Sequence, residues 1–147
     1  MLDTGQVSTS LVVRPAKPTD HPQIESMRQL SIKRLLLPGL SDDERQALTA
    51  VMTFDPQLVA DGSYFVAEVN GRIAAGGGWS RRCALFRGAG SGGREHILNP
   101  ETDPAAIRAM YTHPDFARSG LGSVLLATAE AAARIAGFRS ARLIAMP

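Results

Sequence analysis

The hydrophobic pattern of the first forty residues predicts one strand followed by one helix. An apolar run at residues 11–14 stops at Pro15, which is typical of a short strand. From residue 24 to about residue 36, apolar side chains recur at helical spacing. Asp20, followed three residues later by Gln23, is a helix-start signature of the capping-box kind. We therefore expect the helix to begin at about Asp20.

A second helix is predicted to begin at Ser41. The acidic residues 42–44 follow it, and carboxylates in a first helical turn are stabilised by the helix dipole. Residues 48, 51 and 52 give this helix an apolar side, and Asp55-Pro56 closes it.

The clearest local signal is a hairpin. Residues 64–69 are strand-like, and Asn70-Gly71 is the strongest two-residue turn signal, because both central positions of a type I′ turn need a positive φ. Residues 72–79 then form the returning strand. The glycine run at 76–78 inside that strand predicts a bulge or bend at the strand end, or else the close approach of a backbone or a ligand.

The last third of the chain predicts a strand, a helix and another strand. Residues 86–103 form a long Gly-rich and polar connection, and such loops are usually mobile or functional. An extended pattern follows at 107–112, and residues 120–136 are strongly helical. Gly137 is the expected helix stop. Residues 141–145 are predicted to be a final buried strand.

The predicted order of elements is therefore β-α-α-β-β-β-α-β, an α/β fold with a mixed sheet. The closing strand–helix–strand unit predicts a parallel pair, and the hairpin predicts antiparallel strands beside it. Because no linker divides the chain, we expect residues 1–10 to be a flexible tail and residues 11–147 to form a single domain.

Composition narrows the function classes. The formal net charge is only +2 and no Lys/Arg run resembles a nucleic-acid arm, which argues against nucleic-acid binding. No apolar run approaches the ~20 residues of a membrane span, and the N-terminus lacks the apolar core of a secretory signal. The single cysteine, Cys83, excludes an intrachain disulfide and fits a reducing, cytoplasmic setting. We interpret Cys83 as a small buried side chain that packs in the core.

The segment 110–123 gives the clearest indication of a ligand-binding site. It is a predicted strand end, a tight loop and a helix N-terminus, whose first amides have no partner within the helix and sit at the positive end of its dipole. Gly120 and Gly122 let phosphate oxygens approach the backbone, Ser119 adds a hydroxyl, and Arg118 adds a charge. These features predict an anion site suited to a pyrophosphate.

Other kinds of loop also contain glycines at this spacing. A plain tight turn remains an alternative for a Gly-x-Gly before a helix. A Walker loop is excluded because no G-x-x-x-x-G-K-[ST] segment exists. A dinucleotide fingerprint is excluded because Leu125 stands where its third glycine would fall.

The segment Ala117-Arg118-Ser119-Gly120-Leu121-Gly122 resembles the acyl-CoA loop of the GNAT superfamily of N-acetyltransferases, which reads roughly [QR]-x-x-G-x-[GA]. Thr112-His113-Pro114 is similar to the strand exit before that loop. Ala117 departs from the pattern and removes one side-chain contact. The resemblance extends back through the Asn70-Gly71 hairpin and the segment 78–82, and it covers nearly all of residues 11–147.

This resemblance implies a GNAT-like fold that binds acetyl-CoA between two parallel strands, here 107–112 and 141–145, without a metal. The strand end would pair with the pantetheine amides, the loop amides would hold the pyrophosphate, and a backbone N–H near Tyr111 would polarise the thioester carbonyl. The implied cofactor-binding residues are Met110, Tyr111, Thr112, Ala117, Arg118, Ser119, Gly120, Leu121, Gly122 and Ser123.

The implied reaction is direct transfer of the acetyl group to a primary amine of a small molecule or peptide. The alternative is a non-catalytic acyl-CoA-binding domain of the same fold. The sequence does not identify the base that takes the proton of the amine. Glu68, Glu95, Glu101 and Asp103 are candidates, although a solvated or structural role is the ordinary expectation for each.

A few other side chains are candidates for the reacting centre. Tyr111 is a candidate for a polar catalytic role, with core packing as the alternative. His113 is interpreted as a loop residue. Trp79, Arg81 and Arg82 are candidates for the acceptor pocket, where arginines would suit an anionic group on the acceptor.

The resemblance also implies a further helix and hairpin after the strand at 141–145. We therefore interpret the chain as C-terminally incomplete relative to the family. Three explanations stay open: a shortened gene product, a further segment not included in the sequence, or completion by a partner chain. An uncovered strand edge invites pairing with another chain, which favours a homodimer.

Overall fold

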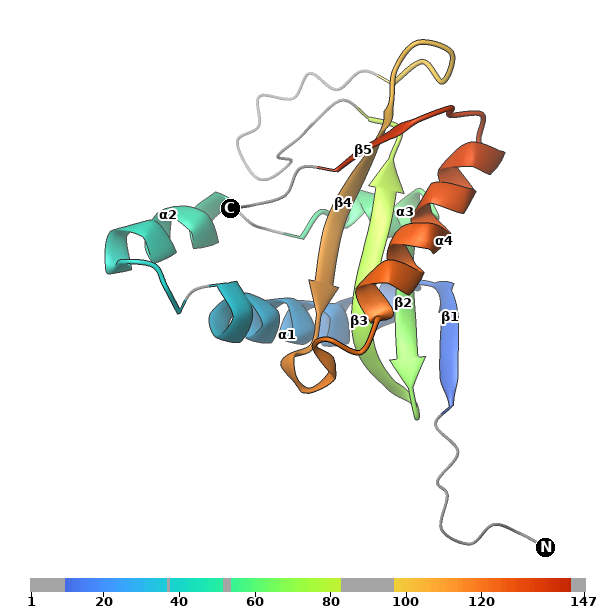
Figure 1. Cartoon of the computed structure of the whole chain (residues 1–147). Helices are drawn as coiled ribbons and strands as arrows, with labels where there is room; N and C mark the ends of the chain where they lie inside the picture. Colours follow the sequence, from blue (N-terminus) through green and yellow to red (C-terminus); the bar gives the residue numbers. More distant parts are fainter. Residues whose placement is uncertain (1–9, 37, 52–53, 83–96, 144–147) are drawn as a thin grey trace, which may run out of the picture.

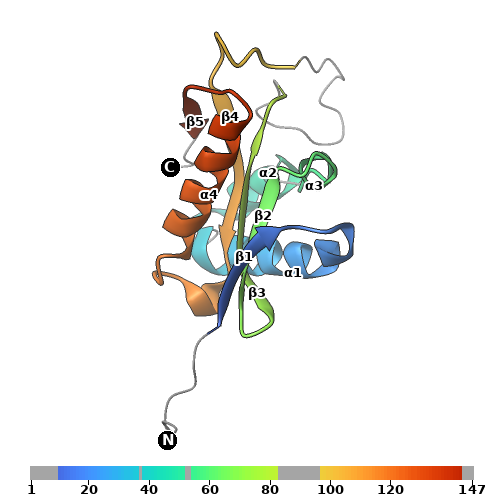
Figure 2. The same cartoon turned by 90° about the vertical axis from the view of Figure 1, so that its right-hand side faces the viewer.

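A mixed sheet with helices on both faces forms the molecule (Figures 1 and 2). The computed structural model describes residues 10–36, 38–51, 54–82 and 97–143. Within these residues the sheet has the order β1-β2-β3-β4-β5, antiparallel throughout except for the parallel pair β4–β5. The mixed sheet and its parallel pair confirm the fold class predicted from the sequence.

The observed elements follow the predicted order. They are β1 Leu11–Pro15, the 3₁₀ turn η1 Pro18–Asp20, α1 His21–Ser31, the π-helical turn η2 Ile32–Leu36, α2 Asp42–Val51, α3 Gln57–Ala60, β2 Tyr64–Val69, β3 Arg72–Ser80, β4 Ala105–Thr112, the 3₁₀ turn η3 Pro114–Phe116, α4 Leu121–Ile135 and β5 Ala141–Leu143. The short helix α3 and the turns η1, η2 and η3 were not predicted, because elements of three to five residues leave no periodicity in the sequence.

The two helix starts differ from each other. At α2 the prediction is confirmed: the Glu44 N–H donates to the Ser41 hydroxyl (3.2 Å), and the Ser41 N–H donates to the Glu44 carboxylate (3.1 Å). At α1 the capping-box prediction is wrong, because Asp20 makes no side-chain cap to this helix. Its carboxylate is occupied instead by the Lys17 N–H (2.7 Å) and by the guanidinium of Arg14.

The predicted hairpin is confirmed. Asn70 (φ 51°) and Gly71 (φ 82°) join β2 to β3, and both central residues have the positive φ that a type I′ turn requires. Asn70 tolerates this conformation better than most residues, and glycine adopts it without steric penalty. The turn fixes the register beside it, with Val69 opposite Arg72, and a register shift between Ala67 and Glu68 then brings Tyr64 opposite Gly78.

The helices lie in two layers, one on each face of the sheet. Helix α4 covers one face, α1 and α3 pack on the other, and α2 lies beyond the β4 edge of the sheet (Figures 1 and 2). The α4 face buries Leu121, Leu125, Ala129, Ala133, Trp79, Ala105, Ile107 and Phe138. The α1 face buries Ile24, Met27, Phe54, Leu58, Tyr64, Val66 and Ile73. Apolar burial on both faces is the main force that holds the helices to the sheet.

Strand β5 lies at the edge of the sheet and is exposed, with Leu143 50% exposed. The prediction of a buried final strand is therefore wrong for Ala141–Leu143. An edge strand has a neighbour on one side only, and α4 covers β3 and β4 instead. Residues 144–145 of the predicted strand lie outside the described residues.

The predicted helix stop is confirmed, because Gly137 (φ 103°) follows α4 and its N–H donates to the Arg134 carbonyl (2.9 Å).

Candidate active site

The segment that links β4 to α4 is held by short-range backbone bonds. As β4 ends, the His113 N–H donates to the Ala74 carbonyl on β3 (2.7 Å). The His113 ring then accepts from the Asp115 N–H through Nδ1 (3.1 Å), which caps η3. Within the described contacts His113 therefore organises the loop, as the sequence suggested.

The loop ends in a helix N-terminus whose amides are not used inside the helix. Gly120 takes a left-handed conformation (φ 86°) as the N-cap, and Arg118 before it also has a positive φ of 63°. The Val124 N–H donates to the Gly120 carbonyl (3.2 Å), so the amides of residues 121–123 precede the first intrahelical donor. They lie at the positive end of the dipole of α4.

The surface around these amides is open. A Cβ atom built on Gly120 or Gly122 would meet nothing within 4 Å. Arg118 and Ser123 are exposed, while Leu121 is buried and anchors the first turn in the core. This open, amide-rich surface has the physical properties of an anion site.

Two of the predicted loop contacts are used within the loop itself. The Ser119 hydroxyl donates to the Phe116 carbonyl, and the Ala117 N–H donates to the Pro114 carbonyl (3.3 Å). The amides from Leu121 onward are therefore better placed for a ligand than the Ser119 hydroxyl.

Strand β4 is paired unevenly along its length. On one side it pairs with β3 over most of its length, but on the other side its described pairing with β5 covers only Ala105–Ile107. Among the described residues, the stretch 108–112 has no strand beside it on the β5 side. This stretch includes Met110, Tyr111 and Thr112, and it leads directly into the loop.

A bulge interrupts β4 at the same place. Gly78 faces Arg108 and Gly76 faces Tyr111, so two residues of β4 lie opposite the single residue Gly77. Ala109, the first of the two, has a φ of 57°, which is uncommon for a residue with a side chain.

The glycine run on β3 makes room for Met110 in the bulge and for Ser63 and Tyr64 on the other side of the strand. A Cβ on Gly76 would lie 2.3 Å from the Tyr64 hydroxyl oxygen, and a Cβ on Gly77 would lie 2.2 Å from the sulfur of Met110. A Cβ on Gly78 would lie 2.5 Å from the Ser63 carbonyl. The bulge predicted for the glycine run is wrong in its place, because the extra residue lies in β4 opposite Gly77. The alternative of a close approach is confirmed, and the groups that approach belong to the protein.

A polar cluster lies beside the bulge on the α1 face. Arg28, which is buried on α1, forms an ion pair with Glu25 and donates to the Tyr111 hydroxyl. Burial raises the pKa of the half-buried Tyr111, and the positive charge of Arg28 opposes that rise. The hydrogen bond from Arg28 lowers the pKa of Glu25, which therefore stays ionised.

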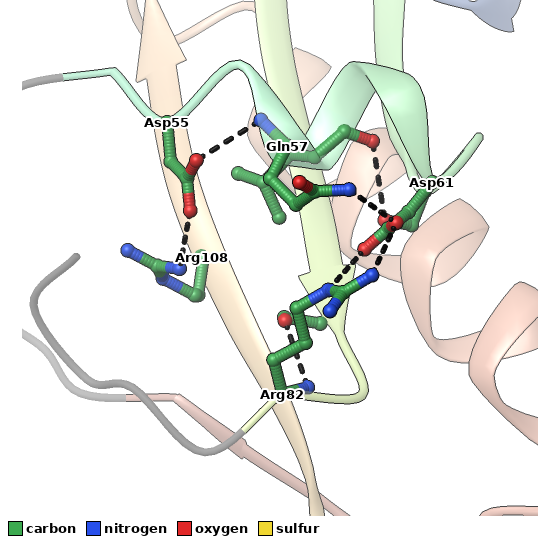
Figure 3. A network of polar contacts seen from close by, with 8 residues as sticks. Asp55, Gln57, Asp61, Arg82 and Arg108 are labelled. Atoms are coloured by element: carbon green, nitrogen blue, oxygen red, sulfur yellow. Dashed lines mark hydrogen bonds and ion pairs between the residues drawn. The ribbon is translucent and has the colours of Figure 1, made fainter. Parts of the chain in front are cut away.

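Two more ion pairs tie α3 to the sheet (Figure 3). Asp55, just before α3, accepts from the Gln57 N–H (3.0 Å) and from Arg108 on β4 (3.4 Å). Asp61, just after α3, accepts from Arg82 through both carboxylate oxygens (2.8 and 2.9 Å). The hydrogen bond to Arg82 lowers the pKa of Asp61 below its ordinary value of 3.8.

The other predicted acceptor residues lie toward the α4 face. Trp79 is buried under α4, where its ring meets that of Phe138 edge-on at 5.7 Å. The guanidinium of Arg81 lies 5.2 Å from the centre of the Trp79 ring. Trp79 therefore contributes to the core beneath α4, and the structure does not bring it together with Tyr111 and Arg108 on the α1 face.

Two of the four acids named from the sequence are engaged elsewhere. Glu68 forms an ion pair with Arg14 on the neighbouring strand, and Asp103 accepts from the Asn99 N–H (2.8 Å). Glu101 is exposed. Glu95 and Cys83 lie outside the described residues.

The sequence interpretation missed the residues of the α1 face that surround the bulge: Glu25, Arg28, Asp55, Tyr64 and Arg108. Their contacts join segments far apart in the chain, such as Tyr64 with Ala109 and Asp55 with Arg108. The only local sign of these contacts was Arg108, an arginine inside an otherwise apolar strand. A charged side chain in such a strand requires a partner.

Within the described ranges, none of the helices combines the length and the apolar character that a membrane span requires. In the same ranges, no group of three or more His, Cys, Asp or Glu side chains is arranged to hold a metal ion.

The chain matches the acetyltransferase (GNAT) family over residues 26–146. It therefore belongs to the GNAT family, whose members transfer acetyl groups from an acyl-CoA donor. This match includes the β4–α4 segment described above. A search of curated proteins gave no significant match.

Solved structures of low sequence identity share the fold. A GNAT family acetyltransferase from Brucella melitensis, crystallised with acetyl-CoA, is 17% identical with a TM-score of 0.61, over 94% of this chain and 77% of that one. The PaiA N-acetyltransferase from Thermoplasma acidophilum, in complex with coenzyme A, is 13% identical with a TM-score of 0.60, over 91% and 78%. A GCN5-related N-acetyltransferase from Kribbella flavida is 18% identical with a TM-score of 0.54, and the match covers 88% of this chain but only 28% of that longer one.

Proposed function

We propose that this protein is an N-acetyltransferase that transfers the acetyl group of acetyl-CoA directly to a primary amine of a small molecule or peptide. The observation that carries the proposal is the continuity of two backbone features. The bulged stretch of β4 at 108–112 runs through η3 into the open amides of α4. Together they offer donors and acceptors to one elongated ligand that ends in a pyrophosphate.

The cofactor is assigned along this path. The backbone of Met110, Tyr111 and Thr112 pairs with the pantetheine amides as an added strand would. The amides of residues 121–123 bind the pyrophosphate, and Gly122 leaves the space that its oxygens need. The exposed guanidinium of Arg118 adds a charge-assisted contact.

In the proposed reaction the amine nitrogen attacks the thioester carbonyl. A C–N bond forms, the C–S bond breaks, and the thiolate of CoA leaves. An amine with a pKa of ~10.4 is only about one part in 10³ unprotonated at pH 7, so a base must take its proton. No described acid is assigned to this step.

We assign Tyr111 a polar role close to the reacting centre. Because its hydroxyl accepts from Arg28, its own proton is available for a second partner. Burial raises its pKa, so the group stays neutral and able to donate. Loss of the hydroxyl in Tyr111→Phe should lower kcat by about 10²-fold while the dissociation constant of acetyl-CoA stays unchanged, measured by steady-state kinetics and calorimetry.

The acceptor pocket is assigned to the α1 face beside Tyr111. Arg82 and Arg108 lie on this face, but each is already paired with an aspartate. This pairing favours an acceptor without a second anionic group. Replacing Arg81 and Arg82 together should therefore leave the acceptor KM largely unchanged.

The first experiment measures binding and turnover separately. Acetyl-CoA at ~100 times its dissociation constant should stabilise the fold by about 2.7 kcal/mol, which is visible as a shift in Tm. CoA release is then followed with a panel of primary amines. Turnover with any amine supports the enzyme, and binding without turnover supports the alternative of a non-catalytic acyl-CoA-binding domain. If acetyl-CoA did not bind to the folded chain, both the enzyme and the non-catalytic acyl-CoA-binding domain would be contradicted.

A further inference from the structure

Tyr64 stands out among the polar side chains of the core. It is fully buried, and its hydroxyl donates to the Ala109 carbonyl at 2.9 Å, a contact between residues 45 positions apart. Resting on the proposed function, we propose that Tyr64 is a positioning residue: its hydroxyl holds the bulge of β4 in the conformation that receives acetyl-CoA.

The bulge needs such a constraint. Ala109 has a φ of 57°, a left-handed conformation in which the Cβ of an L-residue is crowded by its own backbone. Conformations of this kind persist only where the surrounding structure enforces them. The hydrogen bond from the Tyr64 side chain binds the carbonyl of this residue.

Fixing that carbonyl also fixes the next amide. The C=O of Ala109 and the N–H of Met110 belong to one planar peptide group, in which they point in opposite directions. Because Tyr64 binds the carbonyl, the Met110 N–H points away from Tyr64. Met110 begins the stretch of β4 assigned to pantetheine, so Tyr64 sets the direction of a backbone donor at the start of that stretch.

The surroundings keep the Tyr64 ring in one place. A Cβ on Gly76 would lie 2.3 Å from its hydroxyl oxygen, and a Cβ on Gly78 would lie 2.9 Å from its ring, so β3 accepts the ring only where these residues are glycine. Phe54 packs against the other side, edge-on, at 4.9 Å. Burial also raises the pKa of Tyr64, so its hydroxyl is protonated and remains a donor at physiological pH.

The test removes the donor and keeps the ring. In Tyr64→Phe we expect the dissociation constant of acetyl-CoA to rise about tenfold, measured by calorimetry, because the bulge is no longer held. The amide NMR signals of residues 109–111 should shift in the ligand-free variant. Adding Ala109→Gly to Tyr64→Phe should restore the affinity, because glycine adopts a positive φ without steric penalty.

A matched control separates positioning from stability. Ser63 precedes Tyr64, is equally buried, and its hydroxyl donates to the Leu58 carbonyl (3.2 Å). Ser63→Ala also loses one buried hydrogen bond but leaves the Ala109 contact intact, so its Tm should fall while its affinity for acetyl-CoA stays that of the wild type.

Two results would overturn the proposal. The first is a folded Tyr64→Phe protein with wild-type affinity and unshifted signals at 109–111. The second is a loss of affinity that Ala109→Gly does not restore, which would indicate a general loss of structure. Failure of the wild-type protein to bind acetyl-CoA would refute the proposed function instead, and the amide signals would still decide whether Tyr64 holds the bulge.

Discussion

The two faces of the sheet are built from different chemistry. Beneath α4 the buried contacts are apolar, with small residues such as Ala129 and Ala133 close to Trp79 and Phe138. Beneath α1 and α3 an apolar core is combined with ion pairs, among them Arg108–Asp55 and Arg82–Asp61. In our proposal the cofactor uses backbone groups at the end of the apolar face, and the acceptor uses side chains of the polar face.

This difference has a physical reason. A pyrophosphate is bound well by backbone amides at a helix N-terminus, and the helix needs only a firm apolar anchor such as Leu125 to hold them in place. An amine acceptor must be oriented and must lose a proton, which requires polar side chains. Buried charges require partners, and the pairs on the α1 face meet that need.

The largest expected effect is loss of the anchor of α4. Leu125 is fully buried between the helix and the sheet, so Leu125→Ala should lower the free energy of unfolding by about 2–5 kcal/mol through lost burial and the cavity left behind. Urea denaturation measures the change. The preceding residue, Val124, is 38% exposed, and Val124→Ala should change stability by less than about 1 kcal/mol. Equal losses in both variants would contradict an apolar anchor at Leu125.

The glycine run offers a direct comparison of the two faces. Gly76→Ala would push against the Tyr64 ring, which is held by Phe54 and by its hydrogen bond to Ala109. Overpacking of this kind should cost about 1–3 kcal/mol. Gly77→Ala would push against the sulfur of Met110, a flexible side chain that can move, so its loss should be smaller.

The control for this pair is Gly39→Ala, because a Cβ on Gly39 would meet nothing within 4 Å. Thermal and urea unfolding should rank the losses as Gly76→Ala, then Gly77→Ala, then Gly39→Ala. A larger loss at Gly77 than at Gly76 would show that the α4 face is the less tolerant one.

The contacts of the glycine run also show which features could be predicted from the sequence and which could not. The order of elements, the hairpin at Asn70-Gly71 and the loop at Gly120 follow from local rules of periodicity and turn chemistry, and the fold was predicted from them. The bulge at Ala109 leaves no local sign, because it depends on Tyr64 and on Gly76 across two strands. The burial of Trp79 under α4 was also not foreseen, since nothing local states which face of a strand a helix will cover.

A smaller effect is expected from the ion pair at the end of α3. The hydrogen bond from Arg82 lowers the pKa of Asp61 in the folded state, so this pair stabilises the fold above pH 3.8, the ordinary pKa of the carboxyl. The contribution is lost as the pH falls through the lower folded-state pKa. Arg82→Met should therefore reduce stability by about 1 kcal/mol at pH 7 and by less at pH 3.

Combining Arg82→Met with Asp61→Asn isolates the contribution of this ion pair to the free energy of unfolding. In a double-mutant cycle followed by urea unfolding at pH 7 and pH 3, the coupling between Arg82 and Asp61 should be present at pH 7 and weaker at pH 3. A coupling that is independent of pH would mean that the two side chains contribute through packing.

The smallest change in stability is expected at Gly122, together with a clear change in binding. A Cβ on Gly122 would meet nothing within 4 Å, and glutamate favours a helix over glycine and suits a first helical turn, so Gly122→Glu should leave the stability unchanged or raise it by up to about 1 kcal/mol. The added carboxylate repels the phosphate groups assigned to this turn, so the affinity for acetyl-CoA should fall at least about tenfold, whereas Gly122→Ala, which the family pattern allows, should bind as the wild type does. Unfolding and calorimetry on the same variant measure both, with Gly39→Ala as the variant that should alter neither. If Gly122→Glu bound acetyl-CoA as tightly as the wild type, the first turn of α4 would not contact the pyrophosphate, and the backbone assignment on the apolar face would fail while the side-chain assignment on the polar face would stand.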